Sequence, residues 1–290
     1  MLIIIPLLRF NYLFSPNSSL VLKYFLVQSI GSIILLIRLI FLFRFSDQKS
    51  LFLFLIGRGI VWKIGIPPFH FWLLNIIIDL EWLLFFIIAS WQKLLPIYFL
   101  NQICFLRLDI FIVLALLTSV VGSMGESSIK KILILSSLFT GAWIFSAIRS
   151  VKIFWLILLA IYRAILGLFL VFIIKTPIDR VYTNNFYMVR LQKKLIFFTI
   201  FLSIAGLPPS TGFFIKFIVS GILLEFHKYG LLRRLVFRTV ALIYIYMSIF
   251  FLRITFNSVN VKNFLSFQFS RKEIFLIPLI IIGPMIFLII

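Results

Sequence analysis

The sequence predicts an all-α protein, a polytopic bundle of about nine transmembrane helices. Three observations favour this class. Hydrophobic residues make up 63% of the chain and charged residues only 12%, whereas soluble domains carry about 25% charged residues. The apolar runs are continuous rather than alternating, which argues against a transmembrane β-barrel. They recur between short polar breaks and have the length of about 20 residues that a helix needs to cross a bilayer. A soluble enzyme is therefore excluded.

The expected elements follow from the polar breaks. Residues 1–19 form an N-terminal arm that is interfacial or packed on a partner, because the apolar stretch Met1–Phe14 is too short to span and contains Pro6. Residues 20–290 form a single transmembrane domain. Its nine expected spans are 20–43, 51–78, 82–104, 108–125, 129–148, 153–174, 195–226, 235–252 and 274–290.

The charge balance is strongly basic, with 28 Lys and Arg against 8 Asp and Glu and a net charge of +20. Basic loops fall on both sides of the predicted bundle, so the positive-inside rule gives no orientation. We expect these loops to meet acidic partners or anionic lipid head groups rather than nucleic acid. The single cysteine, Cys104, excludes a cysteine zinc site and an iron–sulfur cluster. We expect no metal and no cofactor in this chain.

Several basic residues fall inside predicted spans, where each costs about 2.5–3.5 kcal/mol or more. Lys63 and Lys93 both lie about 17–18 Å from the start of their spans, near the middle of the bilayer. Because burial favours the neutral amine, such a lysine can load and release a proton. The alternative is a lysine permanently paired with a carbonyl or a carboxylate. Glu225 is the only acid clearly within a predicted span. The full set of intramembrane basic residues is Arg38, Arg58, Lys63, Lys93, Arg163 and Lys216.

Two predicted spans carry similar interruptions, GIPP at residues 65–68 and GLPP at residues 206–209. Proline removes backbone hydrogen bonds, and such breaks occur at membrane depth only where protein or a wet cavity surrounds them. Paired interruptions in corresponding halves are typical of inverted-repeat transporters and mark their ion sites. Lys63 precedes the first interruption by two residues, and Lys216 follows Pro209 by seven. Two ordinary proline kinks are the alternative, and they would not predict lysines at these positions.

His70 follows the first interruption and is a candidate proton carrier, because an unperturbed imidazole titrates near pH 6.5. A purely structural hydrogen bond is the equally weighted alternative.

The motif KIGIPPFHFW at Lys63–Trp72 resembles the KLGxxPFHFW motif of the subunit 2 family of respiratory complex I, the proton-pumping NADH:ubiquinone oxidoreductase. The resemblance extends over about residues 20–253. The other segments that agree, in order, are KYFLVQ at Lys23–Gln28, WQKLLP at Trp91–Pro96, KIL with a following Ser-Ser pair at Lys131–Ser137, and GLPPSTGF at Gly206–Phe213 with Lys216.

The resemblance implies an antiporter-like subunit of the membrane arm, built on inverted helix repeats and without a redox centre of its own. In that family Lys63 would couple to a glutamate on an earlier helix, Lys93 would relay protons centrally, and Lys216 would lie on the outward route. Quinone reduction elsewhere in the complex would drive the relay. The implied partners are other membrane-arm subunits, and the implied location is the mitochondrial inner membrane, with a bacterial plasma membrane as the alternative.

Two departures from the family pattern stand out. The family's glutamate-bearing helix precedes Lys23, and the residues before Lys23 contain no acid, so the chain looks N-terminally truncated and its first repeat incomplete. We expect a separate chain to supply the missing helices; a site that works without them, or impaired pumping, are the alternatives. Thr140 replaces a histidine that is common in the family's central helix.

The leading hypothesis is therefore a proton-translocating subunit of complex I, an enzyme as a whole. A free-standing cation/proton antiporter and a structural subunit that does not pump are the alternatives.

Overall fold

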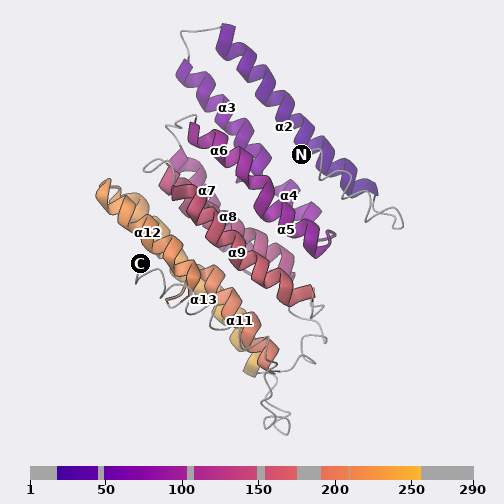
Figure 1. Cartoon of the computed structure of the whole chain (residues 1–290), viewed down its shortest axis with the longest axis vertical. Coiled ribbons are helices and arrows are strands. Elements are labelled where there is room, and N and C mark those ends of the chain that lie inside the picture. The colour runs from indigo at the N-terminus through magenta and orange to yellow at the C-terminus, as the bar shows by residue number, and fades with distance from the viewer. Residues whose placement is uncertain are drawn as a thin grey trace. The chain divides into compact units, whose positions relative to one another are not determined.

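A computed structural model describes residues 18–44, 49–102, 108–148, 154–174, 191–208 and 210–255 (Figure 1). Every secondary-structure element in these ranges is a helix, as predicted. The elements are α2 Ser18–Arg44, α3 Lys49–Ile64, α4 Phe71–Ile77, α5 Trp82–Ser90, the 3-10 turn η2 Trp91–Lys93, α6 Leu94–Gln102, α7 Leu108–Ser123, α8 Ile129–Ile148, α9 Phe154–Ile174, α11 Leu191–Ala205, α12 Thr211–Glu225 and α13 Tyr229–Thr255.

Four stretches in the described part of the chain are long and apolar enough to cross a membrane. These are Leu20–Phe41, Trp82–Gln102, Ile129–Ile148 and Phe154–Ile174, with Asp109–Ser123 as a shorter apolar helix. They coincide with five of the expected spans. The count of nine stays a prediction, and both the span at 274–290 and nearly all of the arm at 1–19 lie outside the described residues. Glu225, expected inside a span, ends α12 with an exposed side chain.

The described helices form two compact groups, one ending at Thr118 and the other beginning at Ser119. In the first group α2 and α3 pack as an antiparallel pair, drawn in indigo and violet in Figure 1. Their approach is close, because a Cβ at Gly59 would lie 2.7 Å from Leu35 Cδ2. Helices in lipid associate through such tight packing and through polar contacts, because an apolar side chain gains little free energy when it moves from lipid into a helix interface. One polar contact runs from the Arg38 guanidinium to the Leu55 carbonyl.

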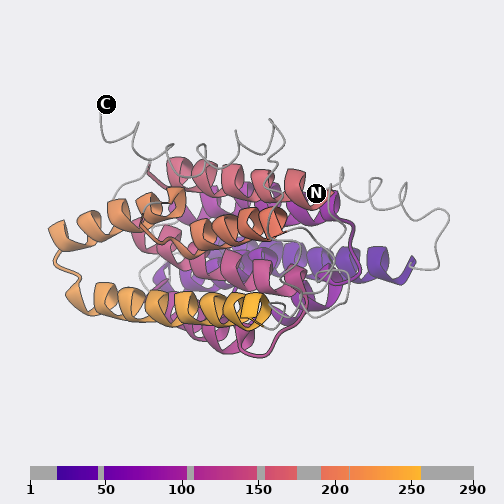
Figure 2. The same ribbon diagram turned by 90° about the horizontal axis from the view of Figure 1, so that it is seen from below.

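In the second group α8 lies at the centre, with nearly every residue buried, and it contacts α9 and α12. Aromatic rings join the surrounding helices: the Phe169 ring of α9 lies 5.5 Å from that of Phe201 in α11, which lies 5.6 Å from the ring of Tyr246 in α13. Figure 2 shows the chain turning back after α12 so that α13 runs antiparallel to it. This group therefore surrounds α8, which carries the Ser-Ser pair and Thr140, with helices on several sides.

Candidate functional site

The chain ends a helix at both predicted interruptions, and it does so with the same backbone hydrogen bonds. Gly65 and Gly206 have φ of +78° and +73°, a left-handed conformation that glycine adopts without the cost a Cβ brings. The amide after each glycine reaches back five residues: Ile66 N donates to Val61 O, and Leu207 N to Leu202 O, both at 3.2 Å. This is the Schellman arrangement of helix C-termini. The two interruptions are therefore equivalent local structures in different parts of the chain.

Lys63 lies in the last turn of α3, one residue before that helix ends, and its side chain is half-buried. It packs across α2, where a Cβ at Gly31 would lie 3.0 Å from Lys63 Cγ. The Gln28 side-chain amide of α2 donates to the Lys63 carbonyl at 3.4 Å. The C-terminal end of a helix carries a partial negative charge, which favours an ammonium group there. Lys63 thus occupies a favourable position for a cation even without a carboxylate.

Lys93 is the last residue of η2 and is only 9% exposed. The sequence predicted a span over 82–104 without an interruption, whereas the chain tightens to a 3-10 turn between α5 and α6. Pro96 explains the change, because it has no amide hydrogen and its ring disfavours a helical carbonyl four residues earlier, at Gln92. The candidate central lysine therefore sits at a third interruption of regular α-helix.

Lys216 lies on α12, 8% exposed, and its ammonium donates to the carbonyl of Ala205, the last residue of α11. That carbonyl is one of those left without an intrahelical partner at a helix end. Lys216 Nζ also lies 5.3 Å from the centroid of the Phe139 ring. The two contacts hold the cation between a helix C-terminus and an aromatic face.

Two glycines allow this arrangement. A Cβ at Gly206 would lie 2.7 Å from both Cε and Nζ of Lys216, so a side chain there would occupy the space of the ammonium. At Gly212, near the start of α12, a Cβ would overlap the Ser203 carbonyl oxygen of α11. The backbones of α11 and α12 therefore meet directly beside Lys216.

His70 lies at the N-terminal end of α4 and is buried, with 7% exposed. Its backbone carbonyl accepts from Leu73 N at 3.1 Å, while the ring nitrogen Nδ1 is buried without a hydrogen-bond partner in the described structure. The ring packs on Phe71, with 4.3 Å between centroids. The imidazole is thus buried beside Phe71 and hydrogen-bonded to the backbone of Pro68.

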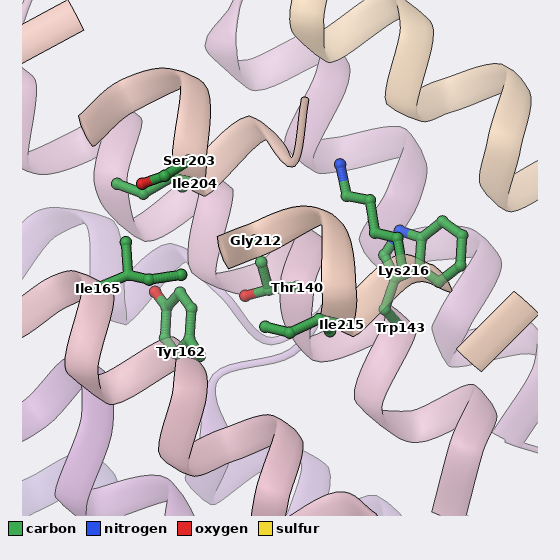
Figure 3. Close-up of a pocket in the computed structure, with 9 residues that line it drawn as sticks. All are labelled: Thr140, Trp143, Tyr162, Ile165, Ser203, Ile204, Gly212, Ile215 and Lys216. Carbon is green, nitrogen blue, oxygen red and sulfur yellow. The ribbon is translucent and has the colours of Figure 1, made fainter. Parts of the chain in front are cut away.

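A small cavity adjoins Lys216 and brings together side chains from α8, α9, α11 and α12 (Figure 3). The volume that the centre of a water molecule can occupy in it is about 10 Å³. The sequence singled out Lys216 as a candidate relay residue and Thr140 as a departure from the family pattern. It did not single out Tyr162 and Trp143, which line the same cavity. The available signal was a tyrosine and a tryptophan within otherwise apolar spans. The lining residues are Thr140, Trp143, Tyr162, Ile165, Ser203, Ile204, Gly212, Ile215 and Lys216.

The predicted lysines fall in both helical groups, Lys63 and Lys93 in the one that ends at Thr118 and Lys216 in the one that begins at Ser119. Lys131 and Glu126 form an ion pair, with 3.0 Å between Nζ and Oε1, near the start of α8. Within the described ranges, no three His, Cys, Asp or Glu side chains gather as a metal site would require.

Comparison with known proteins gives a family match over most of the chain. The family model described as "NADH:quinone oxidoreductase/Mrp antiporter, TM" matches residues 2–241. The chain is 28% identical over 262 residues to NADH-ubiquinone oxidoreductase chain 2 of Locusta migratoria, covering 87% of this chain and 75% of that protein. It is 31% identical over 283 residues to the chain 2 protein of Paracentrotus lividus, covering 89% and 75%. The resemblance identified from the motifs is thereby confirmed.

Solved structures agree on the fold. A chain of respiratory complex I from Thermus thermophilus superposes with a TM-score of 0.68 at 19% identity, covering 81% of this chain and 59% of that one. The chain therefore spans a little over half the length of this structural relative.

Proposed function

Because the chain belongs to the NADH:quinone oxidoreductase/Mrp antiporter transmembrane family, we propose that it is a proton-translocating membrane-arm subunit of an NADH:ubiquinone oxidoreductase. It would contribute to the enzyme as a subunit, with the redox chemistry carried out in other chains. Lys63, Lys93 and Lys216 would relay the protons. His70, with its unpartnered Nδ1, is a further candidate for the relay.

The observation that carries this proposal is the placement of lysines at breaks in α-helix. Lys63 lies in the last turn of the helix before the first interruption, Lys93 lies in a 3-10 turn, and Lys216 binds the helix end at the second interruption. A cation buried among apolar helices is costly, so a structure retains it where it serves a purpose. Three lysines that each lie beside a break in α-helix support one shared task better than three unrelated structural roles.

The geometry suggests how such a lysine changes state. A helix C-terminus stabilises the ammonium through its unpaired carbonyls and partial negative charge, as Ala205 O does for Lys216. Burial opposes the same charge. The two effects offset each other, so a modest change in neighbouring charge or hydration shifts the population between ammonium and amine. Quinone reduction elsewhere in the complex would supply that change.

The proposed partners are other membrane-arm subunits, including a chain that contributes further N-terminal helices and a glutamate facing Lys63. The proposed location is the inner mitochondrial membrane, in keeping with the names of the relatives. The basic loops would meet anionic lipid head groups. Because the family description includes Mrp antiporters, free-standing cation/proton exchange is the second candidate function.

The test is Lys93→Met in the assembled complex, reconstituted in sealed vesicles, with proton uptake and NADH oxidation measured together. We expect normal assembly and a rate of proton translocation lower by roughly a hundredfold or more, the contribution of a positioned acid–base group. The matched control is Lys228→Met, which changes a lysine in the turn between α12 and α13.

Unchanged proton uptake per NADH in assembled Lys93→Met would remove Lys93 from the relay. Cation/proton exchange by the purified chain in the absence of other subunits would favour the second candidate function instead.

A further inference from the structure

Two arginines from neighbouring helices lie together in the first helical group. Arg38 of α2 is partly buried and Arg58 of α3 is exposed. The Arg38 guanidinium donates to the Leu55 carbonyl of α3, and a Cβ at Gly59, the residue after Arg58, would lie 3.5 Å from Arg38 Nη1. The two cations are close enough for Arg58 to repel Arg38 electrostatically. Two like charges are thus held near each other where α2 and α3 pack.

The direction of the two helices brings both guanidinium groups to one level. Side chains on a helix lean towards its N-terminal end. Because α2 and α3 are antiparallel, Arg38 leans away from the short connection between them and Arg58 leans towards it. The guanidinium carbon of Arg58 accordingly lies 4.9 Å from the centroid of the Phe54 ring, one turn nearer to that connection. Both guanidinium groups therefore lie near the level of Phe54 and Leu55.

The contacts of these two groups are with neutral partners, a backbone carbonyl for Arg38 and an aromatic face for Arg58. A guanidinium carries five N–H donors, and its planar fork fits an oxyanion that offers two oxygens, such as a phosphate or a carboxylate. A carbonyl and a ring use few of these donors and leave the repulsion between the two charges in place. The pair therefore has the chemistry of an anion site.

The pair lies at the depth where lipid head groups begin. With 27 residues α2 is about 40 Å long, close to the thickness of a bilayer that includes its head groups. Arg38 precedes the end of α2 at Arg44 by six residues, or about 9 Å along the helix. The head-group layer occupies about 5–7 Å on each side, so the Arg38 backbone lies just inside the hydrocarbon. Long basic side chains reach the interface from such positions.

The surface of α2 beside this pair is apolar and exposed. Leu20–Phe41 is the least buried of the four long apolar stretches in the described ranges, with 22% of its most apolar part buried against 44–89% in the other three. Residues three or four apart form a stripe along this helix. The stripe consists of Ile30, Ile33, Ile37 and Phe41, each 44–54% exposed. Because Phe41 follows Arg38 by three residues, the stripe ends beside the arginines.

We propose that Arg38 and Arg58 bind the phosphodiester of an anionic phospholipid whose acyl chains lie along the stripe from Ile30 to Phe41. The inference rests on the membrane location in the proposed function and not on the lysine relay. A zwitterionic head group would bring its own ammonium near two guanidinium groups, so an anionic head group fits better. The depth of the pair and the adjoining stripe favour a lipid over a soluble anion. A carboxylate of another subunit is the competing occupant.

The experiment uses the assembled complex in phosphatidylcholine vesicles that contain increasing fractions of phosphatidylglycerol with a photoreactive acyl chain. After illumination, peptides of this chain are analysed for the label. We expect label within residues 30–41, and a defined fraction of phosphatidylglycerol that gives half-maximal labelling. Arg38→Gln and Arg58→Gln should each raise that fraction roughly tenfold, because each removes charge-assisted hydrogen bonds to the phosphate. An unchanged fraction in both variants would overturn the proposal.

The matched control is Lys23→Gln, which removes an exposed positive charge from the same helix, about 22 Å from Arg38. This substitution should leave the half-maximal fraction unchanged. An equal shift in Lys23→Gln would overturn the proposal, since it would reflect a general attraction of anionic lipid to a basic chain. Equally efficient labelling by photoreactive phosphatidylcholine would overturn it too.

Three outcomes would assign the arginines to another anion and so overturn the lipid site. Asp47 lies between α2 and α3 in the sequence, outside the described residues. Stronger labelling in Asp47→Asn would identify that carboxylate as the counter-charge. Loss of label on adding inorganic phosphate would indicate a site for free anions, and an unlabelled parent complex would indicate a carboxylate of another subunit.

The design keeps this proposal separate from the proposed function. If Arg38→Gln fails to assemble because its contact with Leu55 is lost, the exposed Arg58 decides alone. Labelling requires no NADH oxidation, whereas Lys93→Met tests proton translocation. Absent labelling with normal translocation would overturn the lipid site and leave the relay intact.

Discussion

Replacing Gly206 by alanine tests the link between helix termination and the position of Lys216. Gly206 has φ of +73°, and a Cβ there would lie 2.7 Å from Lys216 Nζ and 2.9 Å from Cδ. No side-chain carbon tolerates such distances, so either the helix end or the ammonium must move. Because the α11–α12 backbones touch at Gly212, the ammonium is the freer of the two, and it should leave the Ala205 carbonyl.

The magnitude has two parts. Alanine in the left-handed region costs about 1–2 kcal/mol. Loss of a hydrogen bond from a charged donor costs about 1.5–3 kcal/mol. Gly206→Ala should therefore destabilise the structure by about 2.5–5 kcal/mol, the sum of these two costs. Gly125→Ala is the matched control, because Gly125 has φ of +84° and a Cβ added there would meet nothing within 4 Å, so only the first part applies.

The assay is the midpoint of thermal inactivation of the assembled complex, measured together with proton translocation per NADH oxidised. Gly206→Ala should lower both, and Gly125→Ala should lower the midpoint less and leave translocation unchanged. Equal effects of the two substitutions would refute the reasoning, because the loss would then come from backbone strain alone and the Lys216 contact would contribute nothing.

Two further substitutions probe packing and surface charge. Gly59→Ala should destabilise the α2–α3 pair by about 1–3 kcal/mol, because the added methyl group would overpack against Leu35. The control Gly221→Ala has open space around its Cβ position and should be neutral or stabilising by up to about 1 kcal/mol. A higher thermal midpoint for Gly59→Ala than for Gly221→Ala would contradict this. Glu126→Gln breaks the ion pair between Glu126 and Lys131, whose side chains are 30% and 27% exposed respectively. Because the pair is partly exposed, the free energy of unfolding should change by at most about 1 kcal/mol. Failure of the complex to assemble would show a larger role for this pair.

Local signals in the sequence predicted the helices and the places where two of them end. The glycine-proline clusters at 65–68 and 206–209 act through backbone conformation, which depends on the residues themselves, and α3 and α11 end immediately before them. Pro96 is also a local signal for the 3-10 turn at Lys93. The apolar residues on either side instead favoured the prediction of one uninterrupted span. Hydrophobic periodicity carries little information in a helix that is apolar all round.

The cavity could not be predicted in the same way, since it depends on which faces of four helices meet. Tyr162 and Trp143 read as ordinary members of apolar spans, and only their packing reveals hydroxyl and indole donors without acceptors. Likewise, the scarcity of intramembrane acids suggested lysines without counter-charges. At Lys216 the C-terminal end of α11 takes the place of a counter-charge, through the Ala205 carbonyl. Composition alone does not reveal this arrangement.

The direct backbone contact at Gly212 has a consequence for timing. With no side chain between the end of α11 and the start of α12, these two segments pack backbone to backbone at Ser203 and Gly212. Rotation about the bonds of the Lys216 side chain moves the ammonium without disturbing this contact. Side-chain rotations are much faster than the microsecond-to-millisecond shifts of whole helices. Lys216 should therefore follow changes in its surroundings rather than set their pace, and the slow step of translocation should lie outside this pair of helices.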